Sequence, residues 1–314
     1  MRIGLDVMGG DFAPQATLEG AILASKELAS HIKLVLIGDV SVINNYFKEE
    51  NIDASLFELF PSSSIIGMGE HPVKTYSRKP DSSIAIGFRL LKENKIDAFA
   101  SSGNTGAMLV GSLYTLNTIP GIIRPCVTSV LPREDGSVGI ILDVGANADC
   151  KPDVLYQFGI LGSLYAKHVY NIANPKVGLL NIGEEEEKGN VLAQSTHHLM
   201  KASNDFQFIG NIEGRDLFGD KADVIVCDGF TGNVVLKEAE AFYTLLKRRK
   251  ISDAYFDKFN YENYGGSPIL GINSTVLVGH GISNAKAIKN MILLARDIAE
   301  AKLSQKINQA FNHN

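Results

Sequence analysis

Short apolar runs recur along the chain, and most of them close in glycine, asparagine or aspartate. Their length, β-branched content and bounding turn residues predict strands. Longer stretches between them, at 16–32, 81–95 and 154–170, are typical of helices. Strand and helix therefore alternate, which predicts an α/β fold with a doubly wound, mostly parallel sheet. The eight strand-like runs lie at 2–11, 32–39, 96–104, 138–147, 176–185, 206–214, 222–230 and 274–281.

Ligands of such sheets bind beyond the carboxyl ends of the strands. Nearly all of the Gly, Asn and Asp clusters follow those ends, so we expect them to converge on one crevice. With 314 residues, 45% of them hydrophobic, the length allows one large α/β unit or two smaller domains. We predict a single domain over 1–314. The composition changes only where a basic and aromatic segment interrupts the rhythm, and we predict an inserted helical arm at 244–264.

Charge and cysteine usage narrow the class of protein. The net charge is −5, and its 30 basic and 35 acidic residues are scattered, so nucleic-acid binding is not expected. Cys126, Cys150 and Cys227 form no CxxC pair, which argues against a zinc site, another metal site or a disulfide framework. No run of about 18 apolar residues suggests a membrane span, and no secretory leader is recognised. We expect a protein of the reducing cytoplasm.

The stretch SGNTG at 102–106 follows a predicted strand and precedes an apolar, helix-like segment. A helix N-terminus presents backbone N–H groups and a positive dipole end, so this turn is a candidate anion site. Its members are Ser102, Gly103, Asn104, Thr105 and Gly106.

A second turn repeats this logic. A strand ends at Cys227-Asp228-Gly229, and Thr231, Gly232 and Asn233 then open a helix. Two such turns in one chain favour a phosphate-like ligand more than either does alone.

Three further sets of polar residues are candidates. Lys188 is the lone cation of GEEEEKGN at 183–190 and either holds an anion or pairs with its acidic neighbours. Arg78 and Lys79 precede a predicted helix cap at Asp81 or Ser82, and either form a charged surface loop or recruit phosphate.

The stretch VGHGISNA at 278–285 follows a strand and opens a helix, but Asn284 replaces the third glycine of a dinucleotide fingerprint. His280 is the only histidine at a glycine-rich strand end, whereas we expect His197 and His198 to face solvent from a polar helix.

Taken together, the motifs resemble those of the bacterial acyl-carrier-protein-dependent phosphate acyltransferases of the PlsX type. The resemblance covers almost the whole chain. Its motifs are DVMGGDFAP (6–14), SGNTGA (102–107), RPC (124–126), DVGANADC (143–150), LLNIGEEEEKG (179–189), GNIEGRD (210–216), DVIVCDGFTGNVVLK (223–237), YGGSPILG (264–271) and HGISNA (280–285).

The resemblance implies a three-layer α/β/α fold similar to phosphotransacetylases and isocitrate/isopropylmalate dehydrogenases. It implies an enzyme that converts long-chain acyl-acyl carrier protein and inorganic phosphate to acyl phosphate and free carrier protein, in phospholipid synthesis. It further implies a homodimer without cofactor, in peripheral contact with the inner face of the cell membrane and with a downstream glycerol-phosphate acyltransferase.

For this reaction phosphate is already an anionic nucleophile and a thiolate an adequate leaving group, so positioning and oxyanion donors suffice. We predict catalytic roles for Lys188, Asn233 and His280. Predicted phosphate or substrate contacts are Ser102, Gly103, Asn104, Thr105, Gly106, Asn147, Arg78, Lys79, Thr231 and Gly232.

One segment departs from the family pattern. Before YGG the family carries a longer apolar helical hairpin, whereas here 242–264 is short and rich in Lys and Arg. We therefore predict contact with an anionic membrane or a partner through Arg248, Arg249 and Lys250. The alternatives are a phosphotransacetylase-like enzyme using acyl-coenzyme A, an isocitrate-type dehydrogenase, and a non-enzymatic, membrane-docked organiser of lipid-synthesis partners.

Overall fold

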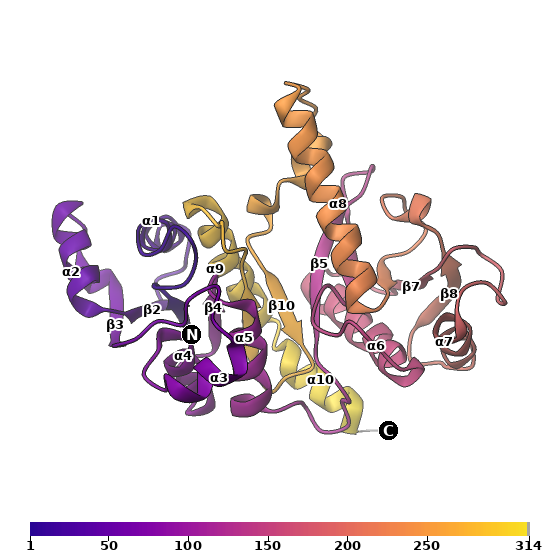
Figure 1. The fold of residues 1–314 in the computed structure, drawn as a ribbon, viewed down its shortest axis with the longest axis horizontal. Coiled ribbons are helices and arrows are strands. Elements are labelled where there is room, and N and C mark those ends of the chain that lie inside the picture. The colour runs from indigo at the N-terminus through magenta and orange to yellow at the C-terminus, as the bar shows by residue number, and fades with distance from the viewer. Residues whose placement is uncertain (313–314) are drawn as a thin grey trace. The chain divides into compact units, whose positions relative to one another are not determined.

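The structure is a computed structural model that describes residues 1–312. The chain forms two compact units (Figure 1). Unit 1 contains residues 1–118 and 261–302, and unit 2 contains residues 119–260 together with the chain from 303 onward. Each unit is described by itself below.

Unit 1 is built on a sheet in the order β3-β2-β1-β4-β11-β10. All of its neighbouring strands run parallel except β10 and β11, which are antiparallel. Its strands are β1 (Arg2–Asp6), β2 (Lys33–Gly38), β3 (Phe57–Pro61), β4 (Ala98–Ser101), β10 (Ser267–Leu270) and β11 (Thr275–Val278). Its helices are α1 (Gln15–Ser25), α2 (Val40–Glu49), α3 (Pro72–Arg78), α4 (Ser83–Lys92), α5 (Thr105–Gly111) and α9 (Ala285–Glu300), with shorter turns at Ala54–Leu56, Ser112–Leu116 and Tyr261–Asn263.

The strand order of unit 1 reverses between β1 and β4, because β2 and β3 extend to one side of β1 while β4 lies on the other. This reversal is a topological switch point, where two neighbouring loops leave the sheet in opposite directions. The SGNTG turn follows β4 directly. The sheet therefore places that turn where an α/β fold opens a crevice.

Unit 2 is built on a sheet in the order β5-β6-β9-β7-β8, in which only β5 and β6 are antiparallel. Its core includes Phe158 and Tyr165, two residues of α6 that are almost completely buried. Its strands are β5 (Cys126–Pro132), β6 (Val138–Leu142), β7 (Lys176–Leu180), β8 (Gln207–Ile212) and β9 (Val224–Val226). Its helices are α6 (Pro152–Val169), α7 (Val191–Lys201), α8 (Gly229–Arg248) and α10 (Leu303–Asn312), with 3-10 turns at Gly214–Asp216 and Phe256–Phe259.

Local sequence explains where the helices begin. Asp39, Ser82, Asn190 and Asn284 each accept a hydrogen bond from a backbone N–H of the helix that follows, at α2, α4, α7 and α9. Such caps satisfy amides that have no partner inside the helix. The predicted cap before α4 is thus confirmed at Ser82.

The alternation read from the sequence is confirmed, because each of the eight predicted runs contains a strand and each of the three predicted helical stretches contains a helix. The sequence did not predict β3, β5 or β10. The expectation for His197 was wrong: it is 3% exposed and its Nδ1 lies 3.0 Å from Asn211 Oδ1.

The basic and aromatic segment begins inside α8, which extends from its first turn at Gly229 to Arg248. In Figure 1 this helix is the long orange element of unit 2. The chain then folds back: Lys247 pairs with Asp257 at 2.8 Å, and Tyr255 Oη donates to the carbonyl of Pro132 at 3.2 Å. Within residues 1–312, no helix is long and apolar enough to cross a membrane.

Candidate functional site

The SGNTG turn of unit 1 has the predicted strand–turn–helix geometry. Strand β4 ends at Ser101, and Asn104 caps α5 by accepting a hydrogen bond from the Ala107 N–H at 3.0 Å. Thr105 is exposed, whereas Ser102 and Gly103 are buried. The turn therefore offers the exposed Thr105 hydroxyl and the first helical amides on a buried backbone.

The amide of Asn104 holds a neighbouring loop. Its Nδ2 donates to the carbonyls of Gly67, Met68 and Glu70, each at 3.1 Å, and the residue is 6% exposed. Two amide protons are shared among three acceptors, so this side chain is fully engaged. Asn104 thus fixes the loop at 67–70 against the turn.

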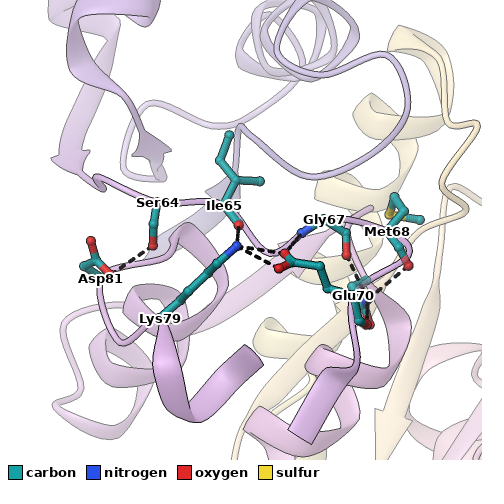
Figure 2. A network of polar contacts seen from close by, with 8 residues as sticks. Ser64, Ile65, Gly67, Met68, Glu70, Lys79 and Asp81 are labelled. Atoms are coloured by element: carbon teal, nitrogen blue, oxygen red, sulfur yellow. Dashed lines mark hydrogen bonds and ion pairs between the residues drawn. The ribbon is translucent and has the colours of Figure 1, made fainter. Parts of the chain in front are cut away.

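Lys79 strengthens the same loop. Its ammonium donates to both carboxylate oxygens of Glu70, at 2.8 and 3.0 Å, and to the carbonyl of Ile65 at 2.7 Å (Figure 2). The hydrogen bond from Lys79 and one from the Gly67 amide hold the pKa of Glu70 below its ordinary value. Arg78, at the end of α3, is exposed.

A buried carboxylate supports the turn from below. Asp6, at the end of β1, accepts hydrogen bonds from the Ser101 hydroxyl at 2.7 Å and from the Met8 amide at 3.0 Å. Its burial raises its pKa. The hydroxyl of Ser102 donates to the carbonyl of Gly9 at 2.8 Å. These bonds tie the loops after β1 and β4 together at the switch point.

The loop after β11 reaches the same end of the sheet, since β11 pairs with β4. The ring of His280 lies 4.8 Å from that of Tyr261, and the side chain is partly exposed. Ser283, which the sequence analysis did not single out, is buried beside Gly279. Ser283 lies within the HGISNA motif, but local sequence does not show that its hydroxyl is buried.

The second turn lies in unit 2, at the start of α8. Asp228 caps this helix: it accepts the Thr231 amide at 2.8 Å and the Thr231 hydroxyl at 2.9 Å. Gly232 is buried, with its Cα so close to the Asp143 carbonyl that a β-carbon would lie 2.0 Å from the oxygen. Asn233 is exposed. This turn carries a negative charge that the turn of unit 1 does not.

Asn147 belongs to the loop that follows β6. Its Nδ2 donates to the Pro125 carbonyl at 2.8 Å and to Asp143 at 2.9 Å, while its backbone amide also reaches Asp143 at 2.6 Å. Asp143 additionally accepts the Val127 amide at 2.9 Å, and burial raises its pKa. The Asn147 side chain therefore joins the loop after β6 to Pro125, the residue before β5.

The acidic run around Lys188 is paired with more distant cations. Glu184 lies 2.7 Å from Lys221, and Glu186 pairs with Lys201. Lys188 makes no ion pair within the described chain, and its exposed side chain passes over Gly183, where a β-carbon would lie 2.8 Å from its Cγ. The Lys188 ammonium is thus exposed and does not pair with its acidic neighbours within residues 1–312.

A cavity of about 360 Å³ adjoins this region in unit 2. It lies at the carboxyl ends of β7 and β9. Leucine side chains form much of its lining, with polar groups at Asn181, Asp228 and Thr231. Pockets of this size and character bind small apolar ligands with a few polar anchors.

Cys150 lies in the loop after β6. Its burial and the nearby carboxylates of Asp143 and Asp228 raise the pKa of its thiol to about 12.

The predicted contact residues Arg248, Arg249 and Lys250 end α8 and are exposed. None of the three makes an ion pair with another residue of 1–312. The predicted site residues are thus divided between the units: those near the SGNTG turn with Arg78, Lys79 and His280 belong to unit 1, and Asn147, Lys188, Thr231, Gly232 and Asn233 belong to unit 2. Among residues 1–312, no cluster of His, Cys, Asp or Glu is arranged to hold a metal ion.

Solved structures share this fold. The EutD phosphotransacetylase from Staphylococcus aureus has a TM-score of 0.65 at 17% identity, covering 95% of this chain and 94% of its own. A phosphotransacetylase from Streptococcus pyogenes has a TM-score of 0.66 at 17% identity with the same coverage. At this identity the likeness concerns the fold, and it confirms the three-layer α/β architecture.

Sequence relatives are much closer. The profile of a family described as "Fatty acid synthesis protein" matches residues 1–250 and 244–306. Phosphate acyltransferase from Dictyoglomus thermophilum is 43% identical over 98% of this chain and 96% of its own length. Phosphate acyltransferase from Halothermothrix orenii is 40% identical over 99% of both. The chain therefore belongs to the fatty acid synthesis protein family, together with the phosphate acyltransferases.

Proposed function

We propose that the enzyme transfers a long-chain acyl group from acyl carrier protein to inorganic phosphate, in phospholipid synthesis. A phosphate oxygen attacks the thioester carbonyl, the carbon–sulfur bond breaks, and the electron pair leaves with the carrier's sulfur. The products are acyl phosphate and the free carrier thiol. The observation that carries this proposal is the 40–43% sequence identity to phosphate acyltransferases over nearly the full length of the chain.

The phosphate belongs in the turn of unit 1. Asn104, which caps α5, is neutral, whereas the cap of α8 is the carboxylate of Asp228. An anion placed beside Asp228 would meet a like charge at short range, which is unfavourable in a site with restricted access to water. The phosphate would then be held by Thr105, the backbone of Gly103 and Gly106, and the buried Ser102, which together form a phosphate cradle. His280 lies on the neighbouring loop.

The other predicted site residues have different parts in this proposal. Asn104 and Lys79 act through the loop at 67–70, which they hold against the cradle. Arg78 draws phosphate electrostatically. In unit 2, Asn147 and Gly232 shape the backbone around them, Thr231 is bonded to Asp228, and Lys188 and Asn233 are exposed.

Surface features of α8 suggest its partners. Phe230, Val234, Phe242 and Leu245 are between 50% and 67% exposed along this helix. Apolar side chains gathered on one element favour contact with another protein. We propose that α8 packs on a second copy to give a homodimer. We further propose that Arg248, Arg249 and Lys250 contact an anionic membrane from the cytoplasmic side, where a glycerol-phosphate acyltransferase takes up the product.

The proposal predicts that purified enzyme releases free carrier protein from palmitoyl-acyl carrier protein only when phosphate is present. Thiol release should be measured with a phosphate titration and with sulfate as the control anion. Equal release without phosphate would indicate a thioesterase. Faster release from palmitoyl-coenzyme A than from the carrier protein would favour the phosphotransacetylase-like alternative, and no release from either would leave the organiser role.

A further inference from the structure

The loop between β11 and α9 contains a buried hydroxyl group without a hydrogen-bond partner in the described chain. Ser283 is 3% exposed, and its Oγ bonds to none of residues 1–312. Leaving a buried hydroxyl unpaired lowers the stability of a fold, so such groups call for an explanation. A ligand that accepts a hydrogen bond supplies one.

The hydroxyl of Ser283 lies beside Gly279, the residue after β11. A β-carbon on Gly279 would lie 3.3 Å from Ser283 Oγ and 3.2 Å from Cβ of Ser102. The two serines therefore lie against the same bare stretch of backbone. The Ser102 proton is already donated to the Gly9 carbonyl, so Ser283 provides the hydroxyl proton that is still available there.

Helix α9 adds further donors beside Ser283. It has 16 residues and begins at Ala285, and its cap Asn284 satisfies the amide of Ala287. The amides at its first two positions have no acceptor within the helix, and the dipole of a helix this long favours an anion at its start. A buried unpaired hydroxyl and a helix N-terminus thus adjoin each other.

Two carboxylates approach this end of α9. Glu262 accepts from Asn284 Nδ2 at 2.8 Å and lies 3.9 Å from the Lys286 ammonium, so a donor and a cation offset its charge. The amide of Asp11 donates to the Gly281 carbonyl at 2.7 Å, and its exposed carboxylate lies near Gly281. The donors here for an anion such as phosphate are the unpaired Ser283 hydroxyl and the first amides of α9, and the Lys286 ammonium adds a cation at the same turn.

We propose that Ser283 and the first turn of α9 bind inorganic phosphate, with the Ser283 hydroxyl donating to one phosphate oxygen. This inference rests on the proposed function, which makes phosphate the acyl acceptor. Ser283 becomes a substrate contact from a loop that lies, along the sequence, far from the SGNTG turn.

The test compares Ser283→Ala with the wild-type enzyme. Removing a hydrogen bond to a charged group should weaken phosphate binding roughly 10- to 100-fold, measured by titration calorimetry with inorganic phosphate. The KM for phosphate should rise, while the KM for palmitoyl-acyl carrier protein stays within about twofold. Without phosphate, the melting temperature should be unchanged or higher, because the variant no longer buries an unpaired hydroxyl.

Ser112→Ala is the matched control. Ser112 is equally buried in unit 1, but its hydroxyl donates to the Met108 carbonyl at 2.8 Å. This variant should melt at a lower temperature and bind phosphate as the wild type does. A purely structural Ser283 would behave like Ser112, and that result would overturn the inference.

Calorimetry needs no acyl donor, so the two proposals can fail separately. If the wild type shows phosphate-dependent release and Ser283→Ala binds phosphate with unchanged affinity, the inference is wrong and the function stands. If the wild type neither binds nor uses phosphate, the proposed function is wrong and the inference falls with it.

Discussion

Replacing Asn104 by alanine should destabilise unit 1 measurably, because this side chain performs two structural tasks. As the cap of α5 its Oδ1 accepts the Ala107 amide, and as a clamp its Nδ2 holds the carbonyls of Gly67, Met68 and Glu70. Loss of a helix cap costs about 1 kcal/mol. Loss of donors to partly buried carbonyls adds about 1–2 kcal/mol.

The expected total is thus about 2–3 kcal/mol of unfolding free energy, or roughly 5–10 °C in melting temperature for a unit of this size. Calorimetry would measure the melting shift. Hydrogen exchange should show faster exchange at residues 67–70, since their carbonyls lose the anchor. Phosphate affinity should fall as well, because the cradle of the turn is no longer held.

Asp39→Ala provides the control. Asp39 caps α2 in the same unit, through the Ser41 and Val42 amides at 2.8 and 3.3 Å, and holds no second loop. It should lose only the cap contribution of about 1 kcal/mol. If Asn104→Ala melts no lower than Asp39→Ala, and exchange at 67–70 is unchanged, the clamp does not contribute to stability.

Two further outcomes follow from charge. Burial raises the pKa of Cys150 from 9.0 to about 12, which leaves about one thiolate in ten thousand at pH 8 instead of one in ten. Alkylation of Cys150 by iodoacetamide should therefore be roughly a thousandfold slower in folded than in urea-unfolded protein. Mass spectrometry would measure both rates, and similar rates would contradict the burial of this thiol. Replacing Arg248, Arg249 and Lys250 by Glu should weaken binding to anionic vesicles by at least about 100-fold, since each basic residue contributes about 1 kcal/mol, while activity on soluble acyl-acyl carrier protein survives. Sedimentation at low and high salt would test this, and binding that ignores both salt and these charges would mean that another surface is responsible.

The sequence predicts the fold well because most strands are apolar runs with clear boundaries. The three missed strands have prolines in or beside them: β3 ends at Pro61, β5 ends at Pro132, and β10 contains Pro268. Proline removes a ladder donor and is typical of loops and edges. In these strands tertiary pairing outweighed the local signal.

The site is less predictable, because its decisive contacts join distant segments. The turn at 102–106 was recognisable from its own residues, but the acceptors of Asn104 lie 34 to 37 positions earlier in the chain. The pairing of Glu186 with Lys201, which leaves Lys188 without an ion pair, is likewise non-local. Ser283 could be identified only after its neighbours were in place.

The two units support their turns in the same way. In unit 1 a β-carbon on Gly103 would lie 3.2 Å from Asp6 Oδ2, and in unit 2 a β-carbon on Gly229 would lie 2.6 Å from Asp143 Oδ2. Each turn therefore rests on a buried carboxylate from the neighbouring parallel strand or the residue after it. Donors fixed in position orient reactants and stabilise developing charge in an active site. The supports match, but the helix caps differ in charge: the cap of α8 is the carboxylate of Asp228, and the cap of α5 is the neutral Asn104.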